Sequence, residues 1–144
     1  MVVEKEEDLG IEIIHKIFTM IIAITSDGSN LDSNLSEKFT RAPFIIFYNK
    51  EEETSEAIRN PYSALFGGAG IQTAQLINEN NANAVIACDI GLNAFRLLRS
   101  ANVEVYPCSK LKVREVIREF ELGRLTEVKR EPKDYYKKIK DKLY

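Results

Sequence analysis

Short apolar runs alternate with helical repeats over residues 84–122, and this alternation limits the possible folds more than any other feature of the sequence. Residues 84–88 and 103–106 are short apolar runs, as in buried strands. Each is followed by apolar residues at helical spacing, over residues 93–100 and 111–122, and Gly123 favours an end to the second helix. This order predicts two parallel strands with right-handed crossovers.

The first half of the chain predicts further strands of the same sheet. Residues 21–25 form a continuous apolar run that ends at the turn formers Ser26-Asp27-Gly28, which indicates a buried strand. Residues 44–48 and 55–59 are strand-like, and the polar stretch between them predicts a hairpin. A helix is expected from Ile71. The predicted fold class is therefore α/β, with a mixed, mostly parallel sheet and helices on its faces.

The chain has the size of one domain with a single core, since it has 144 residues and 44% hydrophobic content. Its patterning divides it into three parts. Residues 1–19 form an acidic N-terminal extension that we expect to be dispensable, residues 20–125 form the domain, and residues 126–144 form a charged tail that we expect to be helical.

Composition excludes several classes of protein. A formal charge of −2 gives no reason to expect a nucleic-acid partner, and no apolar run is long enough to span a membrane. The acidic start is unlike a signal peptide, and two cysteines without CxxC spacing fit a reduced, cytoplasmic protein. The single histidine, His15, precedes the predicted domain, so a histidine-dependent triad or metal cage is not expected there.

The glycine cluster Gly67-Gly68-Ala69-Gly70 comes just before the helix that we expect from Ile71. Free N–H groups at a helix start favour an anion, so the cluster suggests an anionic ligand. It does not match the phosphate-binding GxxxxGK[ST] or dinucleotide-binding GxGxxG patterns. The alternative, of about equal weight, is a tight loop that needs glycine for its backbone shape.

A second group of candidates follows the predicted strands, since ligands of open α/β sheets bind outside the carboxyl ends of strands. Asp27 and Asp89 follow two such strands and are candidates to hold a divalent cation, although both are also ordinary turn residues. Cys88 ends a strand beside a glycine turn, where a thiolate suits iron or a cluster edge, but a small buried apolar role is an open alternative. Cys108 follows the last strand and is placed near the same edge.

From Met20 onward the chain resembles the dinitrogenase iron-molybdenum cofactor biosynthesis family, which includes NifX, NafY and the C-terminal domain of NifB. The resemblance consists of several blocks in order over about a hundred residues. The blocks are Ile21-Ile22-Ala23-Ile24, Ser36 to Phe44, Asn60-Pro61, Gly67-Gly68-Ala69-Gly70-Ile71 with Ala74, Gly91-Leu92-Asn93-Ala94-Phe95, and Val105-Tyr106. It implies a ribonuclease H-like fold, binding of iron-sulfur or iron-molybdenum cofactor precursors, metal-cluster assembly proteins as partners, and no catalysis.

The family block often reads His-Phe-Gly-Arg-Ala-Pro, whereas this chain has Lys38-Phe39-Thr40-Arg41-Ala42-Pro43 and so lacks that histidine. Leu92 also stands where the family often has proline. The resemblance implies site or loop-shaping roles for Arg41, Gly68, Gly70, Gly91 and Asn93, and Cys88 is added on chemical grounds as a candidate metal ligand. Lys38 remains able to attract an anion.

Three hypotheses follow. The leading one is a non-enzymatic binder or carrier of a metal-sulfur cluster. The second is a regulatory or protein-interaction domain of the same fold without a cluster. The third is a phosphate- or nucleotide-handling enzyme.

Overall fold

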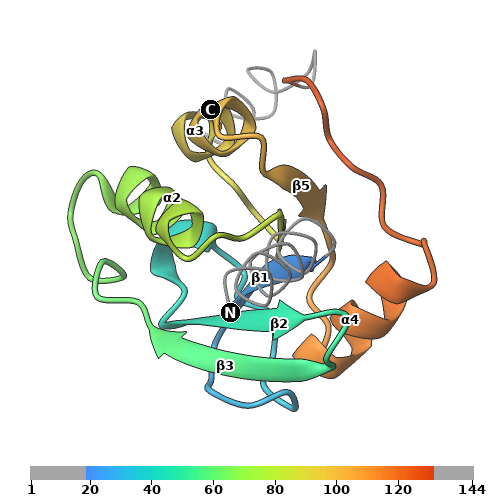
Figure 1. Cartoon of the computed structure of the whole chain (residues 1–144). Helices are drawn as coiled ribbons and strands as arrows, with labels where there is room; N and C mark the ends of the chain where they lie inside the picture. Colours follow the sequence, from blue (N-terminus) through green and yellow to red (C-terminus); the bar gives the residue numbers. More distant parts are fainter. Residues whose placement is uncertain (1–18, 132–144) are drawn as a thin grey trace, which may run out of the picture.

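The computed structural model describes residues 19–131, which form one five-stranded mixed sheet (Figure 1). The strand order across the sheet is β3-β2-β1-β4-β5. The strands are β1 (Ile21–Ser26), β2 (Phe44–Asn49), β3 (Thr54–Arg59), β4 (Ala84–Ala87) and β5 (Glu104–Pro107). All five strands were predicted from sequence, with ends that differ by one residue at most.

β1 lies in the centre because its run of apolar side chains has to be buried on both faces of the sheet. It pairs antiparallel with β2 and parallel with β4. β2 and β3 form the predicted antiparallel hairpin, and β4 and β5 form the predicted parallel pair. The sheet is therefore mixed, with two antiparallel and two parallel pairings rather than mostly parallel.

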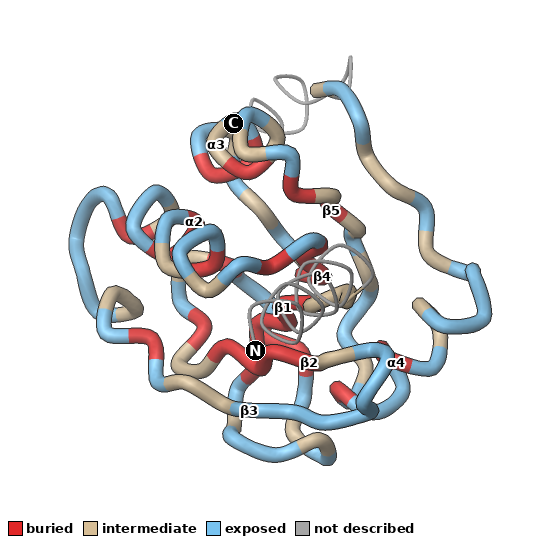
Figure 2. The backbone as a smooth tube through the Cα atoms, in the orientation of Figure 1, coloured by how far each residue is buried: buried red, intermediate tan, exposed pale blue. Residues whose placement is uncertain are grey.

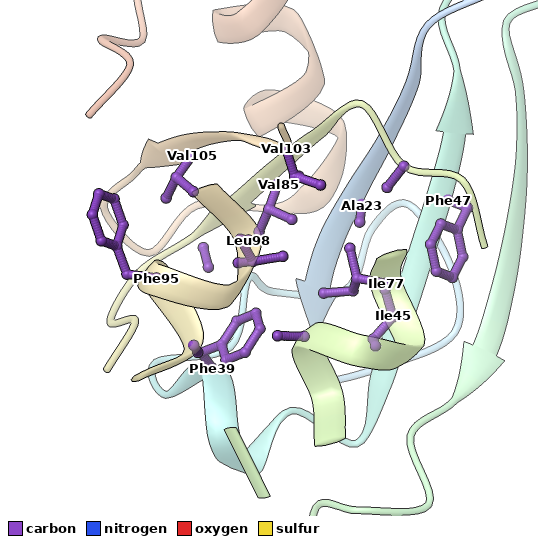
Figure 3. Close-up of a cluster of buried hydrophobic side chains, with 14 residues drawn as sticks. Ala23, Phe39, Ile45, Phe47, Ile77, Val85, Phe95, Leu98, Val103 and Val105 are labelled. Atoms are coloured by element: carbon purple, nitrogen blue, oxygen red, sulfur yellow. The ribbon is translucent and has the colours of Figure 1, made fainter. Parts of the chain in front are cut away.

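Helices cover both faces of the sheet and give three layers. α2 (Ala69–Glu79) and α3 (Leu92–Ser100) pack on one face, and α4 (Val113–Glu121) packs on the other. A short 3-10 helix, η1 (Phe39–Arg41), precedes β2 and buries Phe39 on the α2–α3 side. Figure 3 shows the cluster of buried apolar side chains on this side of the sheet, which includes Ile77 of α2, Leu98 of α3 and Val85 of β4.

Burial explains why the middle of the sheet is so apolar. Every residue of β4, and every residue of β1 except Ile21, is buried (Figure 2). β3 is an edge strand, and its sequence Thr-Ser-Glu-Ala-Ile-Arg leaves most residues exposed. The contrast places the rigid part of the molecule at β1 and β4, whose carboxyl ends lie at the same edge of the sheet.

The C-terminal tail differs from the prediction in the part that the structure describes. Residues 126–131 are not helical; they run beside β5, where the Val128 N–H donates to the Val105 carbonyl at 2.8 Å. The rest of the tail, residues 132–144, and nearly all of the N-terminal extension lie outside the described residues. No helix within residues 19–131 is long and apolar enough to cross a membrane.

Candidate functional site

The carboxyl ends of β1, β4 and β5 meet at one edge of the sheet, where a shallow pocket opens to solvent. Its volume is about 270 Å³, and we call it the rim pocket. The residues that line it are Asp27, Ser36, Glu37, Lys38, Arg41 and Lys110. Three of them are cationic and two are anionic, so the pocket brings together most of the charged side chains that follow β1 and precede β2.

The loop after β1 folds back and forms one wall of the rim pocket. Ser36, which is 2% exposed, donates its hydroxyl to Asp27 Oδ1 at 2.8 Å. Its backbone N–H donates to the Thr25 carbonyl at 3.0 Å, and the Asp27 N–H donates to the Asn34 carbonyl at 2.9 Å. Asp27 is therefore held by neighbouring residues of its own loop.

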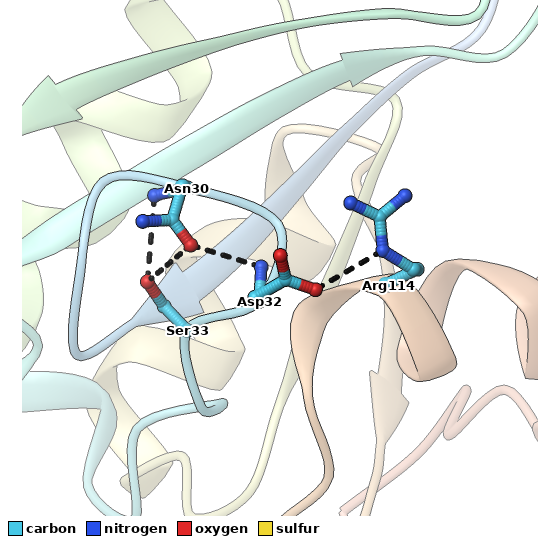
Figure 4. A network of polar contacts seen from close by, with 4 residues as sticks. All are labelled: Asn30, Asp32, Ser33 and Arg114. Carbon is cyan, nitrogen blue, oxygen red and sulfur yellow. Dashed lines mark hydrogen bonds and ion pairs between the residues drawn. The ribbon is translucent and has the colours of Figure 1, made fainter.

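The same loop is fastened to α4 on the other side (Figure 4). Asn30 Oδ1 accepts from the Asp32 backbone N–H at 3.0 Å and from the Ser33 hydroxyl at 3.3 Å. Asp32 Oδ1 in turn accepts from Arg114 Nε at 3.2 Å. Because the Arg114 N–H also donates to the Leu31 carbonyl at 2.8 Å, loop and helix are joined by backbone as well as side chains.

Arg41, for which the resemblance implies a site or loop-shaping role, is bound to the backbone of another loop. Its Nη1 donates to the backbone carbonyls of Ser63 at 2.9 Å and Leu65 at 2.6 Å. The guanidinium therefore fastens the loop that leads into the glycine cluster, while the exposed side chain still borders the rim pocket. Its first role is to position the loop.

Lys38 and Lys110 are the other two cations of the rim pocket. Lys110 Nζ lies 3.2 Å from Glu37 Oε1, and both side chains are well exposed. Such a pair is weak in water, so it leaves the lysine available to a stronger anion. Lys38 is exposed at the start of η1.

The glycine cluster forms the start of α2, as predicted. Gly68 is the N-cap and has a left-handed backbone with φ of 73°. A Cβ atom at Gly70 would lie 3.1 Å from Thr40 Cγ2 and 3.7 Å from Ala94 Cβ. The first turn of α2 therefore packs directly against η1 and the first turn of α3, and a side chain at Gly70 would press on Thr40.

Gly91 and Asn93 stand at the start of α3. Gly91 is its N-cap, with φ of −69° and ψ of 160°, a conformation open to any residue. A Cβ atom there would have no neighbour within 4 Å, so Gly91 has no steric reason to be glycine, and its site or loop-shaping role stays a prediction. Asn93 is exposed in the first turn. The starts of α2 and α3 nevertheless bring two sets of helix N–H groups together.

Cys88 is half-buried just beyond β4. Burial, and next the charge of Cys108, raise the pKa of its thiol to about 11. Asp27, Glu37 and Lys110 also act on this pKa, which places Cys88 beside the rim pocket. Cys88 is thus a protonated thiol at neutral pH, and it becomes a ligand only for a metal that displaces this proton.

The divalent cation site from Asp27 and Asp89 is not supported. Within residues 19–131, no three His, Cys, Asp or Glu side chains come together to hold a metal ion. Asp27 accepts from Ser36, and the Asp89 carbonyl accepts the Phe39 N–H at 2.9 Å, which fastens η1 to the end of β4. Both residues therefore take part in contacts that hold the protein's own loops.

Sequence reasoning missed Ser36 and Lys110 as pocket residues and Thr40 as the neighbour of Gly70. Ser36 and Thr40 lie within one of the family blocks, which was the available signal. Nothing in the pattern of the chain pointed to Lys110.

The family model for the dinitrogenase iron-molybdenum cofactor matches residues 20–123. The chain belongs to this family. The match spans all five strands and the three α-helices. It confirms the resemblance seen in the sequence.

Solved structures agree with membership of the dinitrogenase iron-molybdenum cofactor family. The apo form of the orange protein from Desulfovibrio gigas is 27% identical with a TM-score of 0.73, over 76% of this chain and 92% of that one. A candidate NifB protein from Thermotoga is 32% identical with a TM-score of 0.70, over 80% and 98% of the two chains. A relative found by sequence, an uncharacterized protein of Methanocaldococcus jannaschii, is 29% identical over 78% of this chain and 94% of its own length.

Proposed function

We propose that this chain binds an anionic iron-sulfur or iron-molybdenum cofactor precursor transiently at the rim pocket and passes it to a metal-cluster assembly protein. The observation that carries the proposal is the junction of the α2 and α3 starts at Thr40, which lies in the chain between the pocket residues Lys38 and Arg41. Membership of a cofactor-related family supports the identity of the cargo. The proposal includes no catalytic step.

An anion gains from this junction in two ways. The first-turn N–H groups of a helix have no partner within the helix, and the helix dipole places partial positive charge there. Two such starts lie close together, since a Cβ atom at Gly70 would be 3.7 Å from Ala94 Cβ, and we infer that both act on the same anion. The nearby cations add charge-assisted contacts, which salt weakens because the side chains are exposed.

Weak retention of the cargo follows from the ligands available. Among the described residues, Cys88 is the thiol whose pKa responds to the charges of the rim pocket, and its proton must first be displaced. A cluster would therefore be held mostly by charge and hydrogen bonds, with at most one soft bond. Binding of this kind suits a carrier, which must release its cargo.

The strand order β3-β2-β1-β4-β5, with an antiparallel hairpin before the parallel strands, supports the ribonuclease H-like topology that the resemblance implies.

We also propose that residues 20–125 fold without residues 1–19. A truncated protein that is insoluble, or that melts far below the full chain, would contradict this boundary.

The cargo can be tested by anaerobic titration with a cluster donor, followed by visible absorption and iron analysis. Lys38→Gln should weaken binding mainly at low salt, whereas Cys88→Ser should weaken it at every ionic strength. Lys129→Gln is the matched control, because Lys129 lies near Glu127 in the segment beside β5, 3.8 Å between charged atoms, and does not line the rim pocket. Wild-type protein that stays metal-free with every donor overturns the proposal.

The same titration decides between this function and the second hypothesis, a protein-interaction domain without a cluster. Phe66 is fully exposed, and Leu65 and Ile71 are partly exposed, so the loop before α2 and its first turn present an apolar patch beside the site. Failure of all cluster donors would leave this patch as the functional surface. Phosphodiesterase activity lost in Asp27→Asn would instead favour an enzyme.

A further inference from the structure

Cys88 and Cys108 continue two neighbouring parallel strands by one residue. The last assigned pair of β4 and β5 is Ala87 with Pro107, so the two cysteines face each other at the next position of the register. The ladder does continue there, since the Cys108 N–H donates to the Ala87 carbonyl at 3.0 Å. Residues 20 positions apart in the sequence therefore become direct neighbours.

Both side chains lie on the same face of the sheet. Ala84 and Ile86 of β4 and Tyr106 of β5 belong to the cluster under α4, and side chains alternate along a strand. Cys88 and Cys108 keep this alternation and pack against the same cluster. Both are half-buried and free, so the two sulfur atoms share an apolar surrounding that solvent still reaches.

The spacing of parallel strands favours a bridging metal over a disulfide. Neighbouring strands lie ~4.8 Å apart, so facing Cβ atoms in a parallel pair are separated by about this distance. A disulfide needs Cβ atoms ~3.8 Å apart, which would pull the two strands together. A metal with bonds to sulfur of ~2.3 Å joins sulfur atoms up to about 4.6 Å apart and needs no such movement.

The number of donors selects the kind of metal. Zinc in structural sites takes four ligands, and within residues 19–131 no third His, Cys, Asp or Glu joins a pair to form such a site. Calcium and magnesium take oxygen ligands and do not suit two thiols. A soft monovalent ion of the copper(I) class takes thiolate ligands and is satisfied with few of them.

We propose that Cys88 and Cys108 form a two-thiolate site for one soft monovalent metal ion, on the α4 side of the carboxyl ends of β4 and β5. The site shares Cys88 with the proposed cluster function, but it is argued from the register of two strands and not from the junction of α2 and α3, and Cys108 belongs to this site alone. Binding exchanges two thiol protons for one metal ion, with no change of oxidation state.

The test is an anaerobic competition between the reduced full-length protein and a chromophoric copper(I) chelator. We expect one tightly bound ion per chain, with thiolate-to-metal absorption in the ultraviolet. Cys88→Ser and Cys108→Ser should each weaken binding more than about 100-fold, the upper cost of losing an outer-shell partner. Ser109→Ala, at an exposed neighbour of Cys108, is the control and should bind like the wild type.

Alkylation gives a second measurement that does not need the variants to fold. One equivalent of copper(I) should protect both cysteines of the wild type from iodoacetamide together. The proposal would be overturned if copper(I) protects one cysteine alone, or if either single variant keeps the wild-type affinity. It would also be overturned if one ion is shared between two chains. Lys38→Gln separates this site from the cargo site, since it should weaken cluster binding and leave copper(I) binding unchanged.

Discussion

The Nη1 atom of Arg41 lies 2.6 Å from the backbone carbonyl oxygen of Leu65. With the second bond to Ser63, this contact joins η1 to the loop before α2. The guanidinium therefore holds the loop that leads into the glycine cluster. Because Arg41 also lines the rim pocket, this loop, with the exposed Leu65 and Phe66, begins beside that pocket. Arg41 acts on the candidate site first through the loop and only second through its charge.

Replacing Arg41 tests this order of effects. Arg41→Ala removes both bonds to the loop and should expose residues 62–68 to proteolysis and hydrogen exchange, with a loss of about 1 kcal/mol in unfolding free energy. Arg41→Lys keeps the charge but loses the planar fork, and should protect the loop only in part. Arg124→Ala, at an exposed residue bound to Glu119, is the control. If Arg41→Ala leaves the protection of the loop unchanged, Arg41 acts on the site through its charge alone.

Gly70 should tolerate no branched side chain. Gly70→Val adds atoms against Thr40, whose Cγ2 would lie only 3.1 Å from the new Cβ atom, and should cost about 1–3 kcal/mol through overpacking. Removing the obstacle with Thr40→Ala in the same chain should restore part of this loss. The double-mutant cycle in urea measures the coupling, and additive effects would show that the two residues do not press on each other.

Gly68 depends on its backbone angle rather than on space. Its φ of 73° is costly for a residue with a side chain, and no atom lies within 4 Å of a Cβ there. Gly68→Val should therefore lose about 1–2 kcal/mol, and Gly68→Asn should lose less because asparagine adopts this conformation more readily. Gly67→Ala is the control, since Gly67 has neither a positive φ nor a crowded Cβ. Equal stability of the three variants would contradict the assignment.

The strands were predictable because each depends on local patterning. The continuous apolar run from Ile21 to Thr25 indicated a buried strand, and residues 22–25 are buried; Gly123 ends α4 with a positive φ of 70°, as its position suggested. The start of α2 at the glycine cluster was predictable for the same reason. These features need only the residue and its near neighbours in sequence.

The site itself was less predictable because it depends on contacts between distant segments. Arg41 follows a family pattern, but its partners are the carbonyls of Ser63 and Leu65, which carry no side-chain signal. The pairing of Cys88 with Cys108 requires the register of β4 and β5, which periodicity does not determine. The raised pKa of Cys88 follows from burial, which the sequence indicated only as one alternative.

Tyr48 makes the free energy of unfolding depend on pH in the alkaline range. Its buried hydroxyl donates to Glu121 Oε1 at 3.1 Å, and burial, followed by this bond and the glutamate charge, raises its pKa to about 12. The unfolded chain releases this proton near pH 10 and the folded chain keeps it. The stabilising contribution is therefore complete below pH 10 and is lost as the pH rises to about 12.

Tyr48→Phe should lose about 1 kcal/mol at neutral pH and show a flatter stability curve between pH 10 and pH 11.5. Ser109→Ala, at an exposed residue without an ionisable side chain, should keep the wild-type slope. Urea unfolding at several pH values measures both curves. An unchanged slope in Tyr48→Phe would place the alkaline sensitivity elsewhere, for example at Tyr106, whose pKa burial also raises.

The central place of β1 has a consequence for how fast the chain folds. On one side β1 pairs with β2, which forms a local hairpin with β3. On the other side its partners come much later in the chain, since the Ile21 N–H donates to Asn83 Oδ1, 62 residues on. Closing that long loop costs conformational entropy before the pairing of β1 with β4 adds any stabilisation. We therefore expect the antiparallel half to assemble early and the docking of β4 beside β1 to set the rate of folding.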